Sequence, residues 1–249
     1  MDVKKVYEDG NTTKYLVKGV SAALMNSVRR SAISEVPCLA IDEVTFYDND
    51  SPVFDEMLAN RLGLLPIKTD LKSYKENDEV KLVLEKEGPG IVTSKDIKCT
   101  DPKIEILDKK IYITKLPEEG KIKLEMKAIM KKGKEHAKHQ PAIISYNEIV
   151  NIDNNKTHKN ITELMKELPE GSVESKAGKL FFMDPYNIKF HNQPLHILEK
   201  YDVEVNYSDN EFVLTIETTG QLTKEEVISK ALEILNKKVE ELKKEIEKL

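Results

Sequence analysis

The segment NSVRRSAISEVP, residues 26–37, marks a predicted change from helix to strand. Apolar side chains at helical spacing predict an amphipathic helix over residues 22–36; they are Leu24, Met25, Val28, Ala32, Ile33 and Val36. Pro37 disfavours helical backbone at the residue before it, so we expect the helix to end there. The apolar run at residues 38–47 then predicts a buried strand. Two adjacent arginines lie in the middle of the helix, and what they contact is the question that this segment raises.

Shorter signals predict an element on either side of this segment. Residues 13–19 alternate in polarity and end at Gly19, which predicts a strand, and Ser21 can cap the helix that follows. Ser51 and Pro52 indicate the start of a second helix with acidic residues in its first turn. Its apolar residues at helical spacing are Phe54, Met57, Leu58, Leu62 and Leu65.

The middle of the chain predicts strands. Between residues 79 and 130 the polarity alternates with period two, in VKLVLEKE, IEILDKKIYITKL and GKIKLEMKAIM. Residues 147–206 mix short strand and helix patterns, and LFFMDP at residues 180–185 predicts a strand that ends in a proline turn. A β-rich segment therefore lies between two helical ones.

The C-terminal segment predicts a strand over residues 211–216 and then a long amphipathic helix. Thr223 and Glu226 have the spacing of a capping box. Apolar residues then recur as in a coiled-coil seam; they are Ile228, Leu232, Leu235, Val239, Leu242, Ile246 and Leu249. Such a helix reaches about 40 Å, more than the diameter of a small domain. We therefore expect its outer part to pack on another chain; the alternative is that it folds back on its own domain.

The composition is that of a globular chain of one to two domains. The chain has 249 residues, of which 33% are charged. Its mean hydropathy of -0.48 and the lack of a long apolar run exclude a membrane span. The N-terminus has no apolar secretory segment, and neither Cys38 nor Cys99 belongs to a CxxC pair. We expect a cytoplasmic protein without disulfides or a cysteine-built metal site.

The charge pattern gives no indication of a nucleic-acid surface. The net charge is -5, and there is no tryptophan. The longest basic cluster, residues 127–138, is interrupted by Gly133 and Glu135, and we interpret it as a solvated face or turn. We expect no direct sequence-specific DNA binding.

Motifs of common enzyme classes are absent from the sequence. It contains no GxxxxGK[ST], GxGxxG, GxSxG or HExxH. Glu135, His136 and His139 lie close together, but a zinc site needs three or four ligands and the other histidines are in distant segments. A polar turn is the favoured interpretation and a small metal hydrolase the alternative. Cys38 lies in an apolar run, which favours a core residue over a nucleophile.

Four segments together resemble one family. MNSVRRSAISEVPCLAIDEV and DEMLANRLGLLPI are similar to motifs of the D-type subunit of archaeal RNA polymerase. That family includes the third-largest subunit of eukaryotic RNA polymerase II and, more distantly, the N-terminal domain of the bacterial α subunit. GKEHAKHQPA resembles the family segment GKEHAKWQPA, with His139 in place of tryptophan, and TTGQLTKEEVISKALEIL resembles the final helix. The resemblance covers essentially the whole chain.

The resemblance implies an α+β fold in three parts. A discontinuous dimerisation domain, a sheet plus two helices, comprises residues 1–48 and 207–249. A β-rich insert domain comprises residues 49–146. Residues 147–206 form a ferredoxin-like α+β insertion.

The resemblance also implies a role and partners. The chain would be a non-catalytic assembly subunit of DNA-directed RNA polymerase, with nucleotidyl transfer carried out on other subunits. It would form a heterodimer with subunit L through the helical seam, and bind the small zinc-bearing subunit N and the small subunit P. Asn26, Arg29, Arg30 and Glu35 would contact the two large catalytic subunits; the alternative is that the arginines are ordinary surface residues.

Some family members hold Fe–S clusters in the insertion, and this sequence lacks the ligands. Two-cluster ferredoxins repeat C-x2-C-x2-C-x3-C. That spacing falls on His158, Ile161, Leu164 and Leu168, and then on Ile188, His191, Pro194 and Leu198. Aliphatic residues cannot bind iron but can form a small apolar core. We therefore expect the fold without any cofactor, which argues against the alternative of a free-standing ferredoxin-like redox protein.

Overall fold

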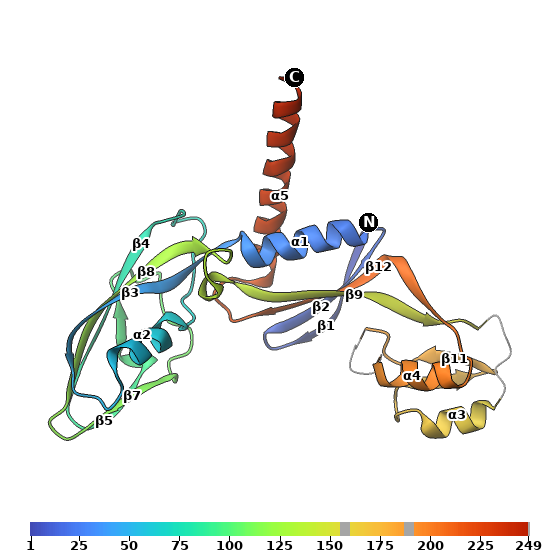
Figure 1. Cartoon of the computed structure of the whole chain (residues 1–249), viewed down its shortest axis with the longest axis horizontal. Helices are drawn as coiled ribbons and strands as arrows, with labels where there is room; N and C mark the ends of the chain where they lie inside the picture. Colours follow the sequence, from blue (N-terminus) through green and yellow to red (C-terminus); the bar gives the residue numbers. More distant parts are fainter. Residues whose placement is uncertain (155–159, 187–191, 249) are drawn as a thin grey trace. The chain divides into compact units, whose positions relative to one another are not determined.

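A computed structural model describes residues 1–154, 160–186 and 192–248 (Figure 1). The chain forms two compact units, each built from two segments. The first unit comprises Met1–Asn26 and Ser145–Ile216, and the second comprises Ser27–Ile144 and Glu217–Leu249. Both units combine mostly antiparallel strands with helices, which agrees with the α+β class expected from the sequence.

The first unit contains a four-stranded sheet in the order β1-β2-β12-β9. These strands are β1 (Asp2–Asp9), β2 (Thr12–Lys18), β9 (Ala142–Ile152) and β12 (Val205–Thr218), the last two continuing into the second unit. Leu16, Ile149 and Val213 form a buried cluster within this unit. The predicted strands at residues 13–19 and 211–216 are confirmed as β2 and part of β12.

A smaller group of elements in the first unit has its own core. It consists of α3 (Ile161–Glu167), β10 (Val173–Lys176), β11 (Lys179–Phe182) and α4 (Asn192–Lys200), with β10 and β11 paired. Leu164, Leu168 and Leu198 are buried together in this core, and Ile161 packs against it. Pro194 is also buried. His158, Ile188 and His191 lie outside the described residues. That these positions correspond to cluster ligands stays a prediction.

The second unit contains a sheet in the order β3-β8-β4-β6. Its strands are β3 (Pro37–Asn49), β8 (Lys121–Lys132), β4 (Glu79–Glu87) and β6 (Ile97–Cys99), and β5 (Gly90–Thr93) pairs with β7 (Tyr112–Leu116). A large buried cluster of apolar residues lies here, where α2 (Asp55–Gly63) packs beside β3. The unit also contains α5 (Lys224–Ile246), the C-terminal half of α1 (Ala22–Ser34) and two short 3-10 helices, η1 (Ser94–Asp96) and η2 (Ala137–His139).

Two of the predicted elements differ from the structure. The second helix begins at Asp55 rather than after Ser51, because Phe54 takes the N-cap position in extended conformation. Phe54 and Met57 are therefore exposed, at 75% and 55%, instead of belonging to a buried face.

The predicted strand over IEILDKKIYITKL is also shorter than expected, since only residues 112–116 are in strand. The Asp101 and Asp108 carboxylates accept hydrogen bonds from the backbone N–H groups of Lys103 and Lys110, both at 2.8 Å. Such side-chain bonds favour turns over a strand ladder. Among the described residues, no helix is both long and apolar enough to cross a membrane.

Candidate functional site

The start of α5 is fixed by the predicted capping box. The Thr223 hydroxyl accepts a hydrogen bond from the Glu226 N–H at 3.2 Å. The Glu226 carboxylate accepts one from the Thr223 N–H at 2.9 Å. Two backbone donors at the helix N-terminus are therefore satisfied, and the negative charge there is favourable.

The N-terminal half of α5 is anchored to the end of α1. Val227 and Ala231 are fully buried. The Ser31 hydroxyl donates a hydrogen bond to the Ala231 carbonyl oxygen at 3.3 Å. One helical turn after Ser31, Glu35 forms an ion pair with Lys238 at 2.5 Å. These contacts hold the helix against its own unit on one face.

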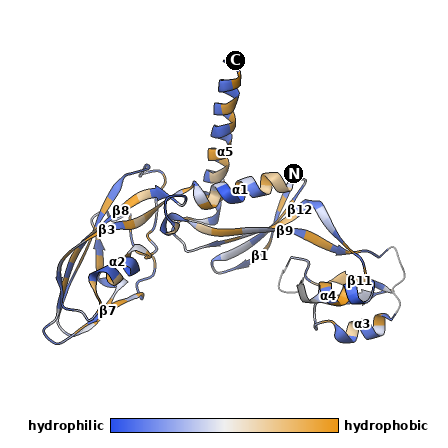
Figure 2. Ribbon diagram, in the orientation of Figure 1, coloured by the Kyte–Doolittle hydropathy of each residue, from blue (hydrophilic) through white to orange (hydrophobic). Residues whose placement is uncertain are grey.

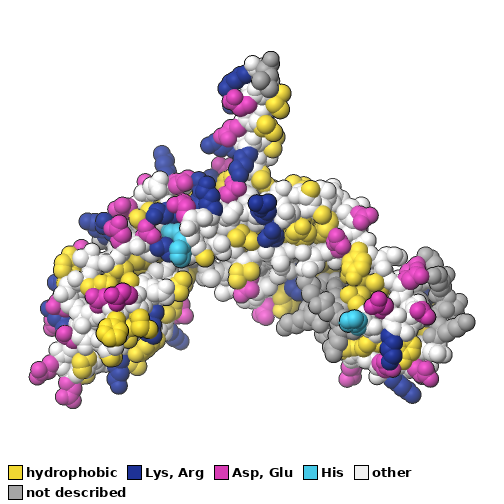
Figure 3. All heavy atoms as spheres, in the orientation of Figure 1, with side chains coloured by type: hydrophobic (Ala, Val, Ile, Leu, Met, Phe, Trp, Pro, Cys, Tyr) yellow, Lys and Arg dark blue, Asp and Glu magenta, His cyan; other side chains and the backbone are white. Residues whose placement is uncertain are grey.

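A different face of α5 is apolar and exposed, and we refer to it as the seam. Its outer residues are Leu232, Val239, Leu242 and Ile246, with exposures of 43%, 65%, 61% and 60%. Ile228 and Leu235 are half-buried, and Leu249 lies outside the described residues. Figure 3 shows hydrophobic side chains along one side of the helix, and Figure 2 shows their alternation with hydrophilic residues. A narrow exposed apolar stripe of this kind is typical of a binding surface.

The two arginines of α1 differ in exposure. Met25, Val28 and Ala32 are buried at 8% exposure or less. Arg30 is exposed, whereas Arg29 and Asn26 are half-buried. Among the described residues, the Arg30 guanidinium has no hydrogen-bond or ion-pair partner. Its five N–H donors are thus available to carboxylates or carbonyl oxygens of another chain.

A groove lies between the end of α1, the end of β8 and α5. It has a volume of about 330 Å³. It is lined by Ser34, Glu35, Lys132, Lys134, Ile234, Lys237, Lys238 and Glu241. The sequence did not single out this set, because its members come from three distant segments and meet only in the folded unit.

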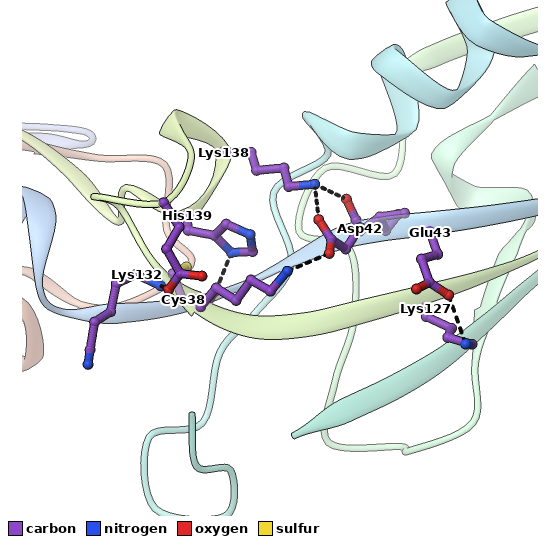
Figure 4. A network of polar contacts seen from close by, with 10 residues as sticks. Cys38, Asp42, Glu43, Lys127, Lys132, Lys138 and His139 are labelled. Atoms are coloured by element: carbon purple, nitrogen blue, oxygen red, sulfur yellow. Dashed lines mark hydrogen bonds and ion pairs between the residues drawn. The ribbon is translucent and has the colours of Figure 1, made fainter. Parts of the chain in front are cut away.

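The basic cluster at residues 127–138 is not simply a solvated face. Lys131 and Lys138 both bond to the Asp42 carboxylate, at 2.7 and 2.5 Å, and Lys127 bonds to Glu43 at 2.8 Å (Figure 4). The two lysines lower the pKa of Asp42 to about 2. One sequence signal for these contacts was the adjacent acidic residues Asp42 and Glu43. They lie in β3, and the pairing of β3 with β8 brings the opposite charges together.

His139 is buried rather than part of a polar surface turn. Its Nδ1 lies 2.9 Å from the Cys38 carbonyl oxygen, and its Nε2 has no partner among the described residues. Burial lowers the pKa of His139 and raises that of the Cys38 thiol to about 11. A thiol held protonated is a poor nucleophile, which agrees with the expected core role of Cys38.

The alternative of a metal hydrolase gains no support from the geometry of Glu135 and His136. His136 Nδ1 accepts a hydrogen bond from the Lys138 N–H at 3.1 Å, and Glu135 accepts one from the Lys132 N–H at 3.3 Å. Within the described ranges, no three His, Cys, Asp or Glu residues are grouped so that they could hold a metal ion. Glu135 and His136 instead make local hydrogen bonds in the turn after β8.

Comparison with known proteins identifies the family. Residues 49–155 match the family model described as the RNA polymerase Rpb3/RpoA insert domain. The DNA-directed RNA polymerase subunit Rpo3 of Pyrococcus furiosus is 34% identical, with 94% of this chain and 93% of that protein covered. The Rpo3 of Thermococcus kodakarensis is 36% identical over 90% of each chain, and that of Methanothermobacter thermautotrophicus is 31% identical over 94% of this chain and 95% of its own. On this evidence the chain belongs to the family of DNA-directed RNA polymerase subunit Rpo3.

Proposed function

We propose that the chain is a non-catalytic assembly subunit of a DNA-directed RNA polymerase. In this proposal the seam on α5 pairs with the small subunit L, and the exposed face of α1 receives the two large catalytic subunits. The single observation that carries the proposal is the seam itself. Its four outer residues are 43–65% exposed although they are aliphatic and follow a coiled-coil spacing.

The energetics of the seam favour a partner. Complete burial of one aliphatic side chain contributes about 1.5–3 kcal/mol relative to exposure. The four outer residues are 43–65% exposed and can therefore gain only part of this amount each. Together they offset part of the cost of association, which lies at about 4–15 kcal/mol. The anchored half of α5 reduces the remaining cost, because the helix is already ordered by its capping box and by Val227 and Ala231.

The role assigned to α1 depends on its polar face. Asn26, Arg29, Arg30 and Glu35 are the proposed contacts to the large subunits. Arginine suits such a contact because its planar guanidinium forms bidentate hydrogen bonds at interfaces. Small subunits N and P belong to the proposed assembly as well, and no particular surface of this chain is assigned to them.

The proposed domain division follows the same family. It assigns residues 1–48 and 207–249 to dimerisation, residues 49–146 to the insert domain and residues 147–206 to a ferredoxin-like insertion without clusters. Leu164, Leu168 and Leu198 support the last part, since an apolar core occupies the insertion. Iron and acid-labile sulfide analysis of anaerobically purified protein tests it, and a stoichiometric cluster would contradict it.

A pull-down from cells that express the chain tests the proposed function. The N-terminally tagged chain should recover a small α-like subunit and the two large polymerase subunits, identified by mass spectrometry. A variant with Val239→Asp and Leu242→Asp should lose the small subunit. A control variant with Lys244→Gln and Lys248→Gln changes the net charge by the same amount, but on the polar face of the helix. This control should still recover the small subunit. Recovery of a soluble monomeric chain alone would contradict the proposal.

A further inference from the structure

The groove between α1, β8 and α5 is positively charged in a chain that is acidic overall. Four lysines and two glutamates line it, which leaves a net charge of +2, whereas the chain carries -5. We infer that this groove receives an acidic segment of another polymerase subunit. This inference rests on the proposed assembly function and adds to it the chemistry of one contact.

The lysines of the groove are only partly neutralised within the chain. Lys238 is paired with Glu35 at 2.5 Å, but Lys237 reaches Glu241 only at 4.0 Å, the limit of an ion pair. Among the described residues, the Lys134 ammonium group has no carboxylate partner. Lys132 is paired, with Glu76 at 2.5 Å outside the groove lining. Two ammonium groups are therefore available to an incoming carboxylate.

The backbone that presents Lys132 and Lys134 is held tightly against α1. The Lys134 N–H donates a hydrogen bond to the Ser34 carbonyl oxygen at 3.0 Å. Between the two lysines, a Cβ atom at Gly133 would lie 2.2 Å from the Ile33 carbonyl oxygen, so only glycine permits this approach. The backbone that carries these lysines is thus fixed before a partner arrives, which lowers part of the entropic cost of binding.

The positive surface continues along α1. Ser34 lines the groove, and Arg30 lies one helical turn before it. Because residues four apart lie on the same face of a helix, Arg30 is next to the groove. The Arg30 guanidinium is exposed. A partner segment with two or more carboxylates can therefore bond to the groove lysines and to this arginine together.

The lining favours a peptide over a nucleic acid. Half-buried Ile234 contributes an apolar side chain to the groove lining, which suits an aliphatic side chain of a partner. Glu35 and Glu241, which also line the groove, repel a continuous run of phosphates, whereas a peptide can present its carboxylates only where lysines lie. Nucleic-acid binding depends on many phosphate contacts, and a groove of about 330 Å³ is too small to supply them.

Photo-crosslinking in the assembled polymerase tests the inference. The probe is p-benzoylphenylalanine placed at Lys134, with Lys98, an exposed residue of β6, as the control position. We expect the Lys134 probe to capture a peptide of another subunit that has at least two Asp or Glu residues near the crosslink. Capture of nucleic acid, capture of a segment without acidic residues, or no capture in the assembled enzyme would overturn the inference.

A charge reversal separates this inference from the proposed function. The variant Lys134→Glu/Lys237→Glu should retain the seam partner but recover at least tenfold less of the subunit captured by the probe. The variant Lys95→Glu/Lys98→Glu carries the same charge change on exposed residues elsewhere and should behave as wild type. If wild type recovers no polymerase subunit, the proposed function fails. If wild type and the groove variant recover equal amounts, only the groove inference fails.

Discussion

Both apolar faces of α5 carry aliphatic side chains, but one face is buried and the other is exposed to solvent. Val227 and Ala231 are fully buried against the helix's own unit, while Val239 and Leu242, three and four turns along, are more than 60% exposed. The buried pair lies one position before the predicted seam residues Ile228 and Leu232. The helix thus packs on its own unit through one face and keeps the seam uncovered. A heptad pattern identifies an apolar stripe on a helix. It does not indicate whether the same chain or another chain covers that stripe.

The sharpest test of this comparison places one charge on each face. Val227→Asp buries a carboxylate without a partner and should lower the free energy of unfolding by about 3 kcal/mol or more. Val239→Asp adds the same group where water reaches it and should change that energy by less than about 0.5 kcal/mol. Urea denaturation of both variants measures the difference. Equal losses would mean that the seam is covered by the chain itself.

A second pair of residues extends the comparison to α2. Leu62 is fully buried, and Leu64, two residues later, is 64% exposed. Leu62→Ala should cost about 2–5 kcal/mol in unfolding free energy, because it leaves a cavity in the core of the second unit. Leu64→Ala should stay within about 0.5 kcal/mol of wild type. Thermal unfolding of the two variants gives the comparison, and a large loss at Leu64 would indicate that its side chain is covered in solution.

Local structure could be predicted well from the sequence, whereas contacts between residues far apart in the chain could not. The capping box at Thr223 and the strand at β2 depend on neighbouring residues, and both are present. The burial of His139 depends on Cys38, which is 101 residues away, and the groove depends on three segments. Phe54 shows a further limit, since apolar spacing predicted burial for a residue that caps the helix and faces solvent.

The substitution Gly133→Ala tests whether the end of α1 needs its close contact with the turn after β8. An added Cβ would lie 2.2 Å from the Ile33 carbonyl oxygen, so the backbone must move in Gly133→Ala. We expect a loss of about 1–3 kcal/mol in unfolding free energy, as for overpacked sites. Gly10→Ala is a control for backbone freedom, since Gly10 has a φ of +50° but no atom within 4 Å of the added Cβ. A smaller loss for Gly133→Ala than for the control would contradict the role of the contact.

The smallest expected effect is a pH dependence from His139. Since the Cys38 carbonyl oxygen can only accept, Nδ1 donates to it and Nε2 is an unpaired acceptor in a buried site. Burial lowers the pKa of His139 below 6.5, and neighbouring Lys138 and Lys131 add to this, whereas the Cys38 bond and Asp42 oppose it. The unfolded chain therefore binds the proton first, and folding stability should decline as the pH falls below 6.5.

A variant separates this contribution from the other titrating groups. His139→Phe removes both the proton site and the unpaired nitrogen, so its unfolding free energy should fall less between pH 7.5 and 5.5 than that of wild type. The pKa of Asp42 is lowered from 3.8 to about 2, so its stabilisation is present above pH 3.8 and is lost only below that value. The two windows do not overlap, and urea denaturation at pH 7.5, 6.5 and 5.5 isolates the histidine. Parallel curves for wild type and His139→Phe would show that the buried nitrogen is paired in solution, and His139 would then not weaken the fold near neutral pH.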